Sequence, residues 1–318
     1  MKRRDFLRTN SALLTSLPLI NLIPGSLTAY MENNIHEFRI GRFQCMIFRD
    51  LMFKYQVKDY FINVDFKELQ SALSRFDITS EIIPSPYISL IIKDDKRTIL
   101  IDSGIGFSDK PIVFKGKEFV LRGQLRDLLR KEAIGDADIT DVILTHFHPD
   151  HIGGVFSDTG QLNYPDATFH IHQKEWDFWH SSKSGAQPPL FKFFVENNIS
   201  PLRGKKINFI VEDYQEILDG IVSVEAPGHT PGQIALNISD GGENLLYISD
   251  AFLHPLHIEQ LDWKTSFDLD HEMARKTRIK LLNLANENDM KINAFHFDFP
   301  GIGRVDTING RWNWVYAS

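Results

Sequence analysis

The chain has 318 residues, of which 42% are hydrophobic and 24% are charged, a composition that excludes a disordered or fibrous protein and allows a sizeable core. Its formal net charge of −7 becomes about −10 without residues 1–29, and such a surface repels phosphate backbones, so we expect no nucleic-acid partner. Cys45 is the single cysteine, which excludes a disulfide within the chain, and we expect it to be a buried thiol.

The first thirty residues differ from the rest of the chain. MKRRDFLR is strongly basic, and the uncharged apolar stretch Ser11 to Ile23 that follows is too short for a stable membrane span. The run RRDFLR resembles a twin-arginine signal. We therefore predict an export signal over residues 1–30 and a periplasmic location for the domain at residues 31–318, with no stable membrane insertion after signal removal. A basic amphipathic N-terminal helix is the alternative.

Beyond residue 30, short β-like runs alternate with helical ones. The expected elements are, in chain order, a hairpin at 87–106 with its turn at 93–97, a helix at 121–133, a buried strand at 141–145, a half-exposed strand at 167–173, a helix at 174–181, a hairpin at 233–250, a long amphipathic helix at 270–289 and a closing strand at 291–297. Mixed hairpins and strand–helix units predict an α/β domain with helices packed outside sheets. Nothing marks a second domain.

One of the predicted strands runs directly into THFHPDHIGGV, which holds three histidines and an aspartate. His146 and His148 are two residues apart, so in extended backbone both side chains project to the same side. Pro149 turns the chain, and Asp150 and His151 must diverge from the first pair. The spacing therefore predicts two neighbouring metal sites. Imidazole with carboxylate suits zinc, iron or manganese, and zinc is the usual occupant.

Three more candidate ligands follow apolar runs elsewhere in the chain. His229 lies in the loop VEAPGHTPG, Asp250 ends the run LLYISD, and His296 follows the strand-like KINAF. Each alone reads equally well as a loop histidine, a strand-end aspartate or a core histidine. Because the ends of several strands can converge on one edge of a sheet, we expect these three to complete a dinuclear centre.

These seven residues, in this order, resemble the ligand set of the metallo-β-lactamase superfamily. THFHPDHIGGV, QKEWDFW, GHTPG and FPGIG resemble the branch that holds methyl parathion hydrolase and related lactonases, over about residues 35–315. The resemblance implies a four-layer αβ/βα sandwich with the metal site at one edge of the sheets. It also implies a role for each residue: His146, His148 and His229 for the first metal, Asp150, His151 and His296 for the second, Asp250 as the bridge, and Asp102 as a support behind the ligands.

Two divalent ions about 3.5–4 Å apart can share a water molecule and convert it to hydroxide near neutral pH. We predict that this metal-bridging hydroxide attacks a small-molecule lactone, ester or phosphotriester, so no catalytic side chain is assigned. Asp250 stands where cysteine-bridged β-lactamases carry a thiolate, which argues against antibiotic hydrolysis. Leu253 stands where acyl-homoserine lactonases carry a tyrosine, so a different hydrogen-bond donor or a better leaving group is implied.

Substrate-side residues are predicted from the resemblance and from aromatic content. Trp179, Phe191 and Phe194 would line an apolar mouth, with ordinary helix packing as the alternative. His254 could face the substrate, with a structural role as the alternative. The competing functions are a β-lactamase or glutathione-thioester hydrolase of the same fold and a non-hydrolytic protein that binds iron for redox chemistry. The sequence leaves a homodimer open.

Overall fold

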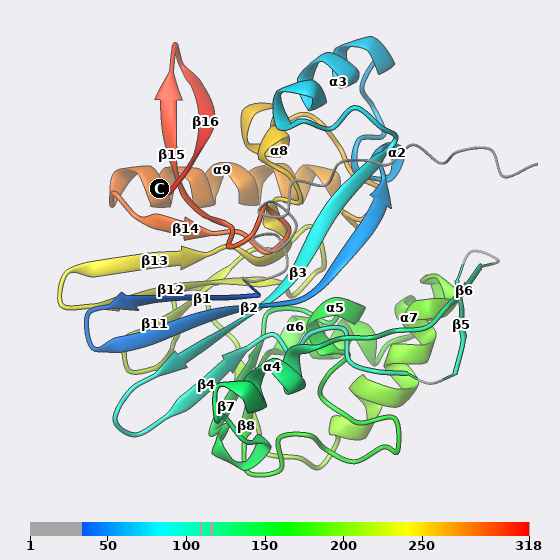
Figure 1. The fold of residues 1–318 in the computed structure, drawn as a ribbon, viewed down its shortest axis with the longest axis vertical. Coiled ribbons are helices and arrows are strands. Elements are labelled where there is room, and N and C mark those ends of the chain that lie inside the picture. The colour runs from blue at the N-terminus through cyan, green and yellow to red at the C-terminus, as the bar shows by residue number, and fades with distance from the viewer. Residues whose placement is uncertain (1–33, 109, 115–116, 318) are drawn as a thin grey trace, which may run out of the picture. The chain divides into compact units, whose positions relative to one another are not determined.

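The computed structural model describes residues 34–108, 110–114 and 117–317, which form two seven-stranded sheets and a short hairpin (Figure 1). The first sheet contains, in spatial order, β1 (Ile35–Ile40), β2 (Phe43–Gln56), β3 (Ile82–Lys93), β4 (Thr98–Ile101), β7 (Asp141–Leu144), β8 (Thr168–His172) and β9 (Ile207–Ile210). The second contains β10 (Glu216–Leu218), β11 (Ile221–Glu225), β12 (Ile234–Asp240), β13 (Glu243–Tyr247), β14 (Lys291–Asn293), β15 (Ile302–Ile308) and β16 (Arg311–Tyr316). The hairpin is β5 (Ile112–Phe114) with β6 (Lys117–Phe119). The predicted export signal lies outside the described residues.

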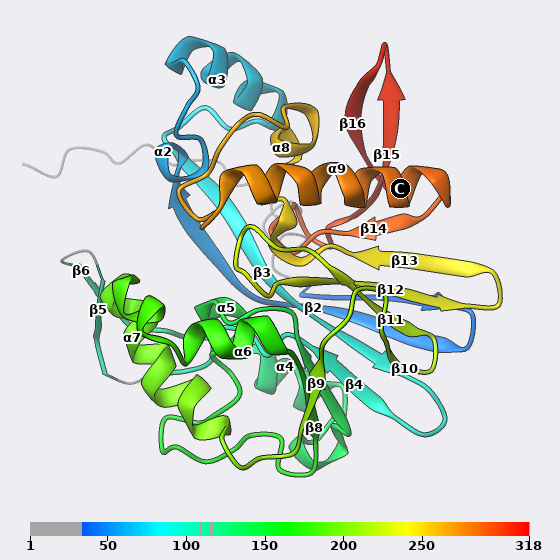
Figure 2. The same ribbon diagram turned by 180° about the vertical axis from the view of Figure 1, so that it is seen from behind.

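Helices cover the outer faces of both sheets, as the two opposite views show (Figures 1 and 2). The first sheet is covered by α4 (Leu125–Lys131) and α6 (Gln173–Trp179), and the second by α9 (His271–Glu287), while α7 (Pro189–Phe194) lies beside the β5–β6 hairpin. Shorter helices lie in connections: α2 (Val57–Tyr60), α3 (Phe66–Leu73), α5 (Pro149–Ile152) and α8 (Pro255–Glu259). This arrangement confirms the predicted α/β sandwich of two helix-covered sheets.

Alternate side chains along the strands of the second sheet point to opposite faces and belong to two different hydrophobic cores. Leu236 and Ile238 of β12 belong to the same buried cluster as Ile47 and Leu90 of the first sheet, so they fill the space between the sheets. Their neighbour Ala235 instead belongs to a second cluster with the leucines of α9. Both faces of the second sheet are therefore buried, which fixes its register.

Most elements predicted from the sequence are confirmed. The hairpins at 87–106 and 233–250 are β3–β4 and β12–β13, and the long helix is α9. The strand at 167–173 is β8, but the prediction that it is half exposed is wrong, because four of its five residues are buried between neighbouring strands and helices. The prediction that residues 291–297 close the fold is also wrong, since β15 and β16 follow β14 in the same sheet.

The parallel strand pairs determine where the polar side chains gather. β4, β7 and β8 run parallel in the first sheet, and β13 and β14 run parallel in the second. Asp102, His146, Asp250 and His296 each follow the carboxyl end of one of these strands. Because carboxyl ends of parallel strands share one edge of a sheet, these four positions are brought to a common place in the fold.

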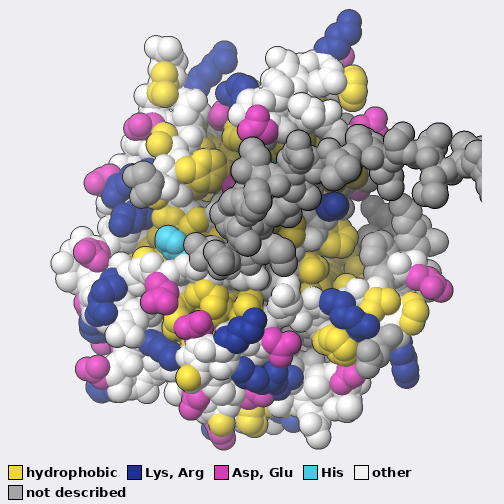
Figure 3. All heavy atoms as spheres, in the orientation of Figure 1, with side chains coloured by type: hydrophobic (Ala, Val, Ile, Leu, Met, Phe, Trp, Pro, Cys, Tyr) yellow, Lys and Arg dark blue, Asp and Glu magenta, His cyan; other side chains and the backbone are white. Residues whose placement is uncertain are grey.

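The surface visible in Figure 3 carries acidic and basic side chains interspersed over its described part. Among the residues that the structure describes, no helix is both long and apolar enough to cross a membrane. Residues 34–318 cluster into one compact unit.

Cys45 lies on β2 with 1% of its surface exposed. Burial raises the pKa of its thiol to about 12. Because the thiolate is the reactive form, we expect no reaction of the folded protein with Ellman's reagent at pH 8, and one thiol per chain after unfolding in guanidinium chloride. A colour change in the folded protein within minutes would contradict this burial.

Candidate metal centre

Local sequence places the first four candidate ligands. β7 ends at Leu144, and the extended residues that follow direct His146 and His148 out of the sheet. Pro149 occupies the first position of α5, where its missing N–H has no intrahelical partner to lose, and Asp150 and His151 lie in the same single turn. The turn packs tightly, because a Cβ on Gly154 would lie 1.9 Å from the carbonyl oxygen of Ser103. Only glycine fits there.

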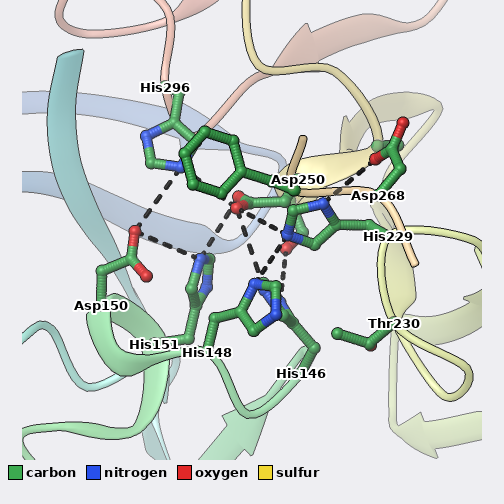
Figure 4. Close-up of polar contacts among 12 residues, drawn as sticks. His146, His148, Asp150, His151, His229, Thr230, Asp250, Asp268 and His296 are labelled. Atoms are coloured by element: carbon green, nitrogen blue, oxygen red, sulfur yellow. Dashed lines mark hydrogen bonds and ion pairs between the residues drawn. The ribbon is translucent and has the colours of Figure 1, made fainter. Parts of the chain in front are cut away.

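The other three candidate ligands arrive from the second sheet. His229 lies between β11 and β12, Asp250 lies in the turn after β13, and His296 follows β14. Figure 4 shows the seven side chains pointing toward one another. They form two groups, and within each group the potential ligand atoms lie within 4.8 Å of one another. The first group contains His146, His148, His229 and Asp250, and the second contains Asp150, His151, His296 and Asp250.

Asp250 is the member common to both groups. Its carboxylate oxygens lie 3.1 Å from Nε2 of His296, 3.3 Å from Nε2 of His151 and 3.4 Å from Nε2 of His229. None of the seven side chains belongs to a residue more than 6% exposed. The centre therefore excludes bulk water from its polar atoms.

The donor set fits divalent cations of the zinc type. Three buried atoms in it, Nε2 of His146, Nε2 of His151 and Oδ1 of Asp250, have no hydrogen-bond partner among the described residues. A buried polar atom without a partner costs free energy, and such atoms are rare unless something else satisfies them. Imidazole nitrogens and carboxylate oxygens at this spacing are ligands that zinc, manganese and iron accept.

Side chains behind the ligands fix which ring nitrogen faces the centre. Asp102 accepts a hydrogen bond from Nδ1 of His151 at 2.8 Å, and Asp268 accepts one from Nδ1 of His229 at 3.2 Å. Nδ1 of His296 lies 3.2 Å from the carbonyl oxygen of Pro86, to which it donates. In all three rings Nε2 is left facing inward, where it is available to a metal ion.

Asp102 and Asp268 are anchored differently. Asp102 follows β4 with φ 57° and also accepts from the backbone N–H of Thr145 and the hydroxyl of Tyr247. Asp268 is paired with the buried Arg278 at 2.7 Å. The sequence predicted the position of Asp102 but not that of Asp268, which follows no strand and belongs to no motif. The only signal for it is the general need of a ligand histidine for an acceptor.

The electrostatics of the centre divide its histidines into two kinds: burial keeps His146 and His148 neutral, whereas the carboxylates beside His151 and His229 outweigh burial and raise the pKa of both rings, that of His229 to about 9. Burial, followed by the neighbouring imidazoles, lowers the pKa of His146 and His148 well below the usual value. Burial opposes ionisation of Asp250, but the rings of His296 and His151 outweigh it and hold the pKa of Asp250 well below its usual range. A cation binds ionised carboxylate and neutral imidazole, so metal binding would release the protons that these carboxylates draw to His151 and His229.

Glu175 of α6 connects the two loops that carry the first group. One oxygen accepts from the backbone N–H of Phe147 at 2.9 Å and the indole N–H of Trp179 at 2.7 Å. The other accepts from the hydroxyl of Thr230 at 2.7 Å and the backbone N–H of Gly232 at 3.0 Å. Phe147 separates two candidate ligands, and Thr230 follows a third. Sequence reasoning missed this residue, although it lies in the familiar segment QKEWDFW.

An apolar cavity opens onto the centre. Five of the candidate ligands lie in its wall. Its apolar side chains come from strands, loops and the helices α5 and α7: Leu51, Phe53, Ile105, Leu121, Pro149, Leu190, Phe191, Leu253 and Phe267. Among the described residues, no lysine or arginine lies in this wall. The cavity can therefore accept an uncharged, apolar group beside the candidate metal centre.

The structure separates the four residues that sequence reasoning placed toward the substrate. Phe191 lines the cavity, with its ring 5.0 Å from that of His148. Trp179 instead stacks on Phe191 at 5.7 Å and is 1% exposed, and Phe194 is buried in the main core. His254 also lies outside the cavity wall, because its Nδ1 accepts the N–H of Leu256 at the start of α8.

Comparison with known proteins agrees with this architecture. A family profile described as the metallo-beta-lactamase superfamily matches residues 85–288, a range that holds six of the seven candidate ligands and ends before His296. A probable metallo-hydrolase of Mycobacterium bovis is 27% identical over 187 residues, which are 52% of this chain and 56% of that protein. A probable metallo-hydrolase of Bacillus subtilis is 25% identical over 224 residues, 64% of this chain and 78% of that protein. The chain thus spans little more than half the length of the mycobacterial relative.

Solved structures extend the similarity over nearly the whole described chain. AidC, a dizinc quorum-quenching lactonase in complex with the product N-hexanoyl-L-homoserine, superposes with a TM-score of 0.79 at 25% identity, covering 90% of this chain and 98% of that one. The hydrolase AbOPH superposes with a TM-score of 0.78 at 22% identity, with the same coverage. At 22% identity, the similarity to AbOPH is a similarity of fold.

Proposed function

Because the chain belongs to the metallo-beta-lactamase superfamily, we propose that it is a dinuclear metal-dependent hydrolase of uncharged lactones, esters or phosphotriesters. The observation that carries this proposal is the pair of buried four-residue groups that share Asp250. His146, His148 and His229 would hold one ion, and Asp150, His151 and His296 the other. Zinc is the metal we propose, since it is the usual occupant of imidazole and carboxylate sites in hydrolases and AidC is named a dizinc lactonase.

When bound, two such ions supply Lewis acidity and a water molecule that ionises near neutral pH. The chain's own residues prepare the site for that chemistry. Asp102 and Asp268 hold two imidazoles in the orientation needed, and Asp250 keeps a negative charge between the groups. The apolar wall removes bulk water from the scissile bond, which strengthens every electrostatic interaction within the site.

The charge of the cavity wall supports an uncharged substrate. A β-lactam antibiotic and a glutathione thioester both carry carboxylates, and away from the two ions an apolar wall would offer such a carboxylate no cationic side chain, so burying it there is costly. No cationic side chain lines the described wall. Oxygen esters, lactones and phosphotriesters with apolar groups meet no such penalty. The lactonase activity named for AidC points in the same direction.

Localisation rests on the N-terminal sequence. The twin-arginine-like run and the short apolar stretch in residues 1–30 support export to the periplasm by a pathway that carries folded proteins. We include this location in the proposal.

A panel assay on the metal-loaded protein tests the proposed function. We expect about two zinc ions per chain and turnover of at least one lactone, aryl ester or phosphotriester, with much slower turnover of a chromogenic β-lactam and a glutathione thioester. Removal of metal with a chelator should abolish turnover, and zinc or manganese should restore it. One tightly held iron per chain, or hydrolysis of the thioester alone, would refute the proposal.

A further inference from the structure

Two tyrosines on adjacent strands place their hydroxyl groups together in the wall of the cavity. Tyr55 lies on β2 and Tyr87 on β3, and both side chains line the cavity that opens onto the candidate metal centre. Their hydroxyl oxygens are 2.6 Å apart. Both rings lie near the second metal group, with centroids 6.1 Å and 5.6 Å from the ring of His296.

Counting hydrogen-bond donors shows that this pair has one O–H group to spare. In a bond between two hydroxyls one proton is shared, and the other proton needs an acceptor elsewhere. Neither hydroxyl has a further hydrogen-bond partner among the described residues. The third phenol in the wall, Tyr60, already donates to Ser85 at 2.9 Å. The spare O–H of the pair is therefore the donor that the cavity offers to a bound molecule.

An ordinary phenol keeps its proton at neutral pH, because its usual pKa is about 10. A phenol that stays protonated donates a hydrogen bond without transferring its proton. The other polar groups that the wall presents are candidate metal ligands, and Leu253, the residue closest in sequence to Asp250 in that wall, has no polar atom.

We propose that the Tyr55–Tyr87 pair donates a hydrogen bond to the substrate oxygen that gains negative charge as the acyl or phosphoryl bond to the leaving group breaks. This inference rests on the proposed hydrolase function. Hydrolysis places the oxygen of water on the acyl carbon or phosphorus, and the leaving oxygen receives its proton from that same water. The phenols supply no proton. They lower the barrier because a fixed donor is worth most where charge develops in a site without bulk water.

The experiment compares Tyr55→Phe, Tyr87→Phe and the double variant with wild type in the zinc-loaded full-length protein, on the best substrate of the panel. Either single variant keeps one hydroxyl, whose proton no longer bonds to its partner, so we expect kcat within about threefold of wild type. The double variant should lose roughly 10- to 100-fold in kcat, with KM within about twofold. Its affinity for a phosphonate analogue of the transition state, measured by calorimetry, should fall by a similar factor.

Tyr164→Phe is the matched control, because Tyr164 is a fully buried tyrosine outside the cavity wall whose hydroxyl has no partner among the described residues. The double variant removes both partners of the hydrogen bond and leaves no buried donor or acceptor unpaired, so it should keep its zinc content and thermal midpoint. A double variant with kcat within about threefold of wild type, or a loss confined to KM, would overturn the inference. A wild-type enzyme inactive on the whole panel would instead refute the proposed function and this role with it.

Discussion

Replacing Asp250 by alanine is expected to reduce the turnover number more than about 100-fold and to lower bound zinc from two ions per chain to at most one. Even residues behind the ligands typically change metal affinity or activity by about 10- to 100-fold, and Asp250 is the only residue common to both candidate groups. Its removal also leaves the inward-facing nitrogens of His296, His151 and His229 without the carboxylate that each now faces. This single substitution would therefore weaken the binding of both ions.

The measurement combines zinc content by elemental analysis with kcat on the best panel substrate. Asp141→Asn is a suitable control, since Asp141 is another buried aspartate, bonded to His170 at 2.8 Å, but belongs to neither candidate group. The control should keep both ions. An Asp250→Ala protein that retains about a tenth of the wild-type rate, or both ions, would refute the bridging role.

The sequence was most informative where chemistry is encoded locally. His146, His148, Asp150 and His151 lie within six residues, and the proline and glycines around them indicate a tight turn in the sequence itself. Candidate ligands from distant segments could be predicted because each follows a strand, and parallel strands share an edge.

Residues that act from behind the ligands could not be predicted in this way. Asp268 and Glu175 reach the centre only because a loop before α9 and the first turns of α6 pack against it. Asp268 follows no strand, Glu175 lies in the first turn of α6 three residues after β8, and an isolated acidic residue in a sequence is usually solvated. The aromatic segment was ambiguous for a related reason. Its three candidate residues all pack against other side chains, and the position of each around the axis of α6 or α7 decides which one lines the cavity. That residue is Phe191, and the two that do not are Trp179 and Phe194.

Glu175→Gln is expected to lower the free energy of unfolding by about 3 kcal/mol, because four donors converge on its two oxygens. A glutamine has only one acceptor oxygen. Its amide N–H₂ must face either the N–H of Phe147 and the indole of Trp179, or Thr230 and the N–H of Gly232. Burial raises the pKa of Glu175, whereas these four bonds favour its ionised form, so the charge is held by contacts that the amide cannot replace.

The same substitution should weaken the first metal group more than the second. Glu175 restrains the backbone between His146 and His148 and the residue after His229, but contacts no member of the Asp150 group. We therefore expect a competing chelator to remove one of the two zinc ions at a chelator concentration about 10- to 100-fold lower than in wild type. The concentration that removes the other ion should be unchanged.

Glu225→Gln separates this coupling from a general loss of charge. Glu225 pairs with Lys174, the exposed neighbour of Glu175 in α6, and such a pair contributes about 0–1 kcal/mol. The same oxygen of Glu225 lies 3.3 Å from Nε2 of His172, and the amide oxygen of a glutamine can still accept from both groups. Its variant should unfold like wild type and keep both zinc ions with unchanged affinity. Two outcomes would contradict this role. If Glu175→Gln weakens the binding of both zinc ions equally, or lowers stability while the binding of both is unchanged, the residue stabilises the fold without positioning the first metal group. Unequal loss of the two ions requires that Glu175 of α6 hold the loop of His146 and His148 and the loop of His229 in their positions relative to each other.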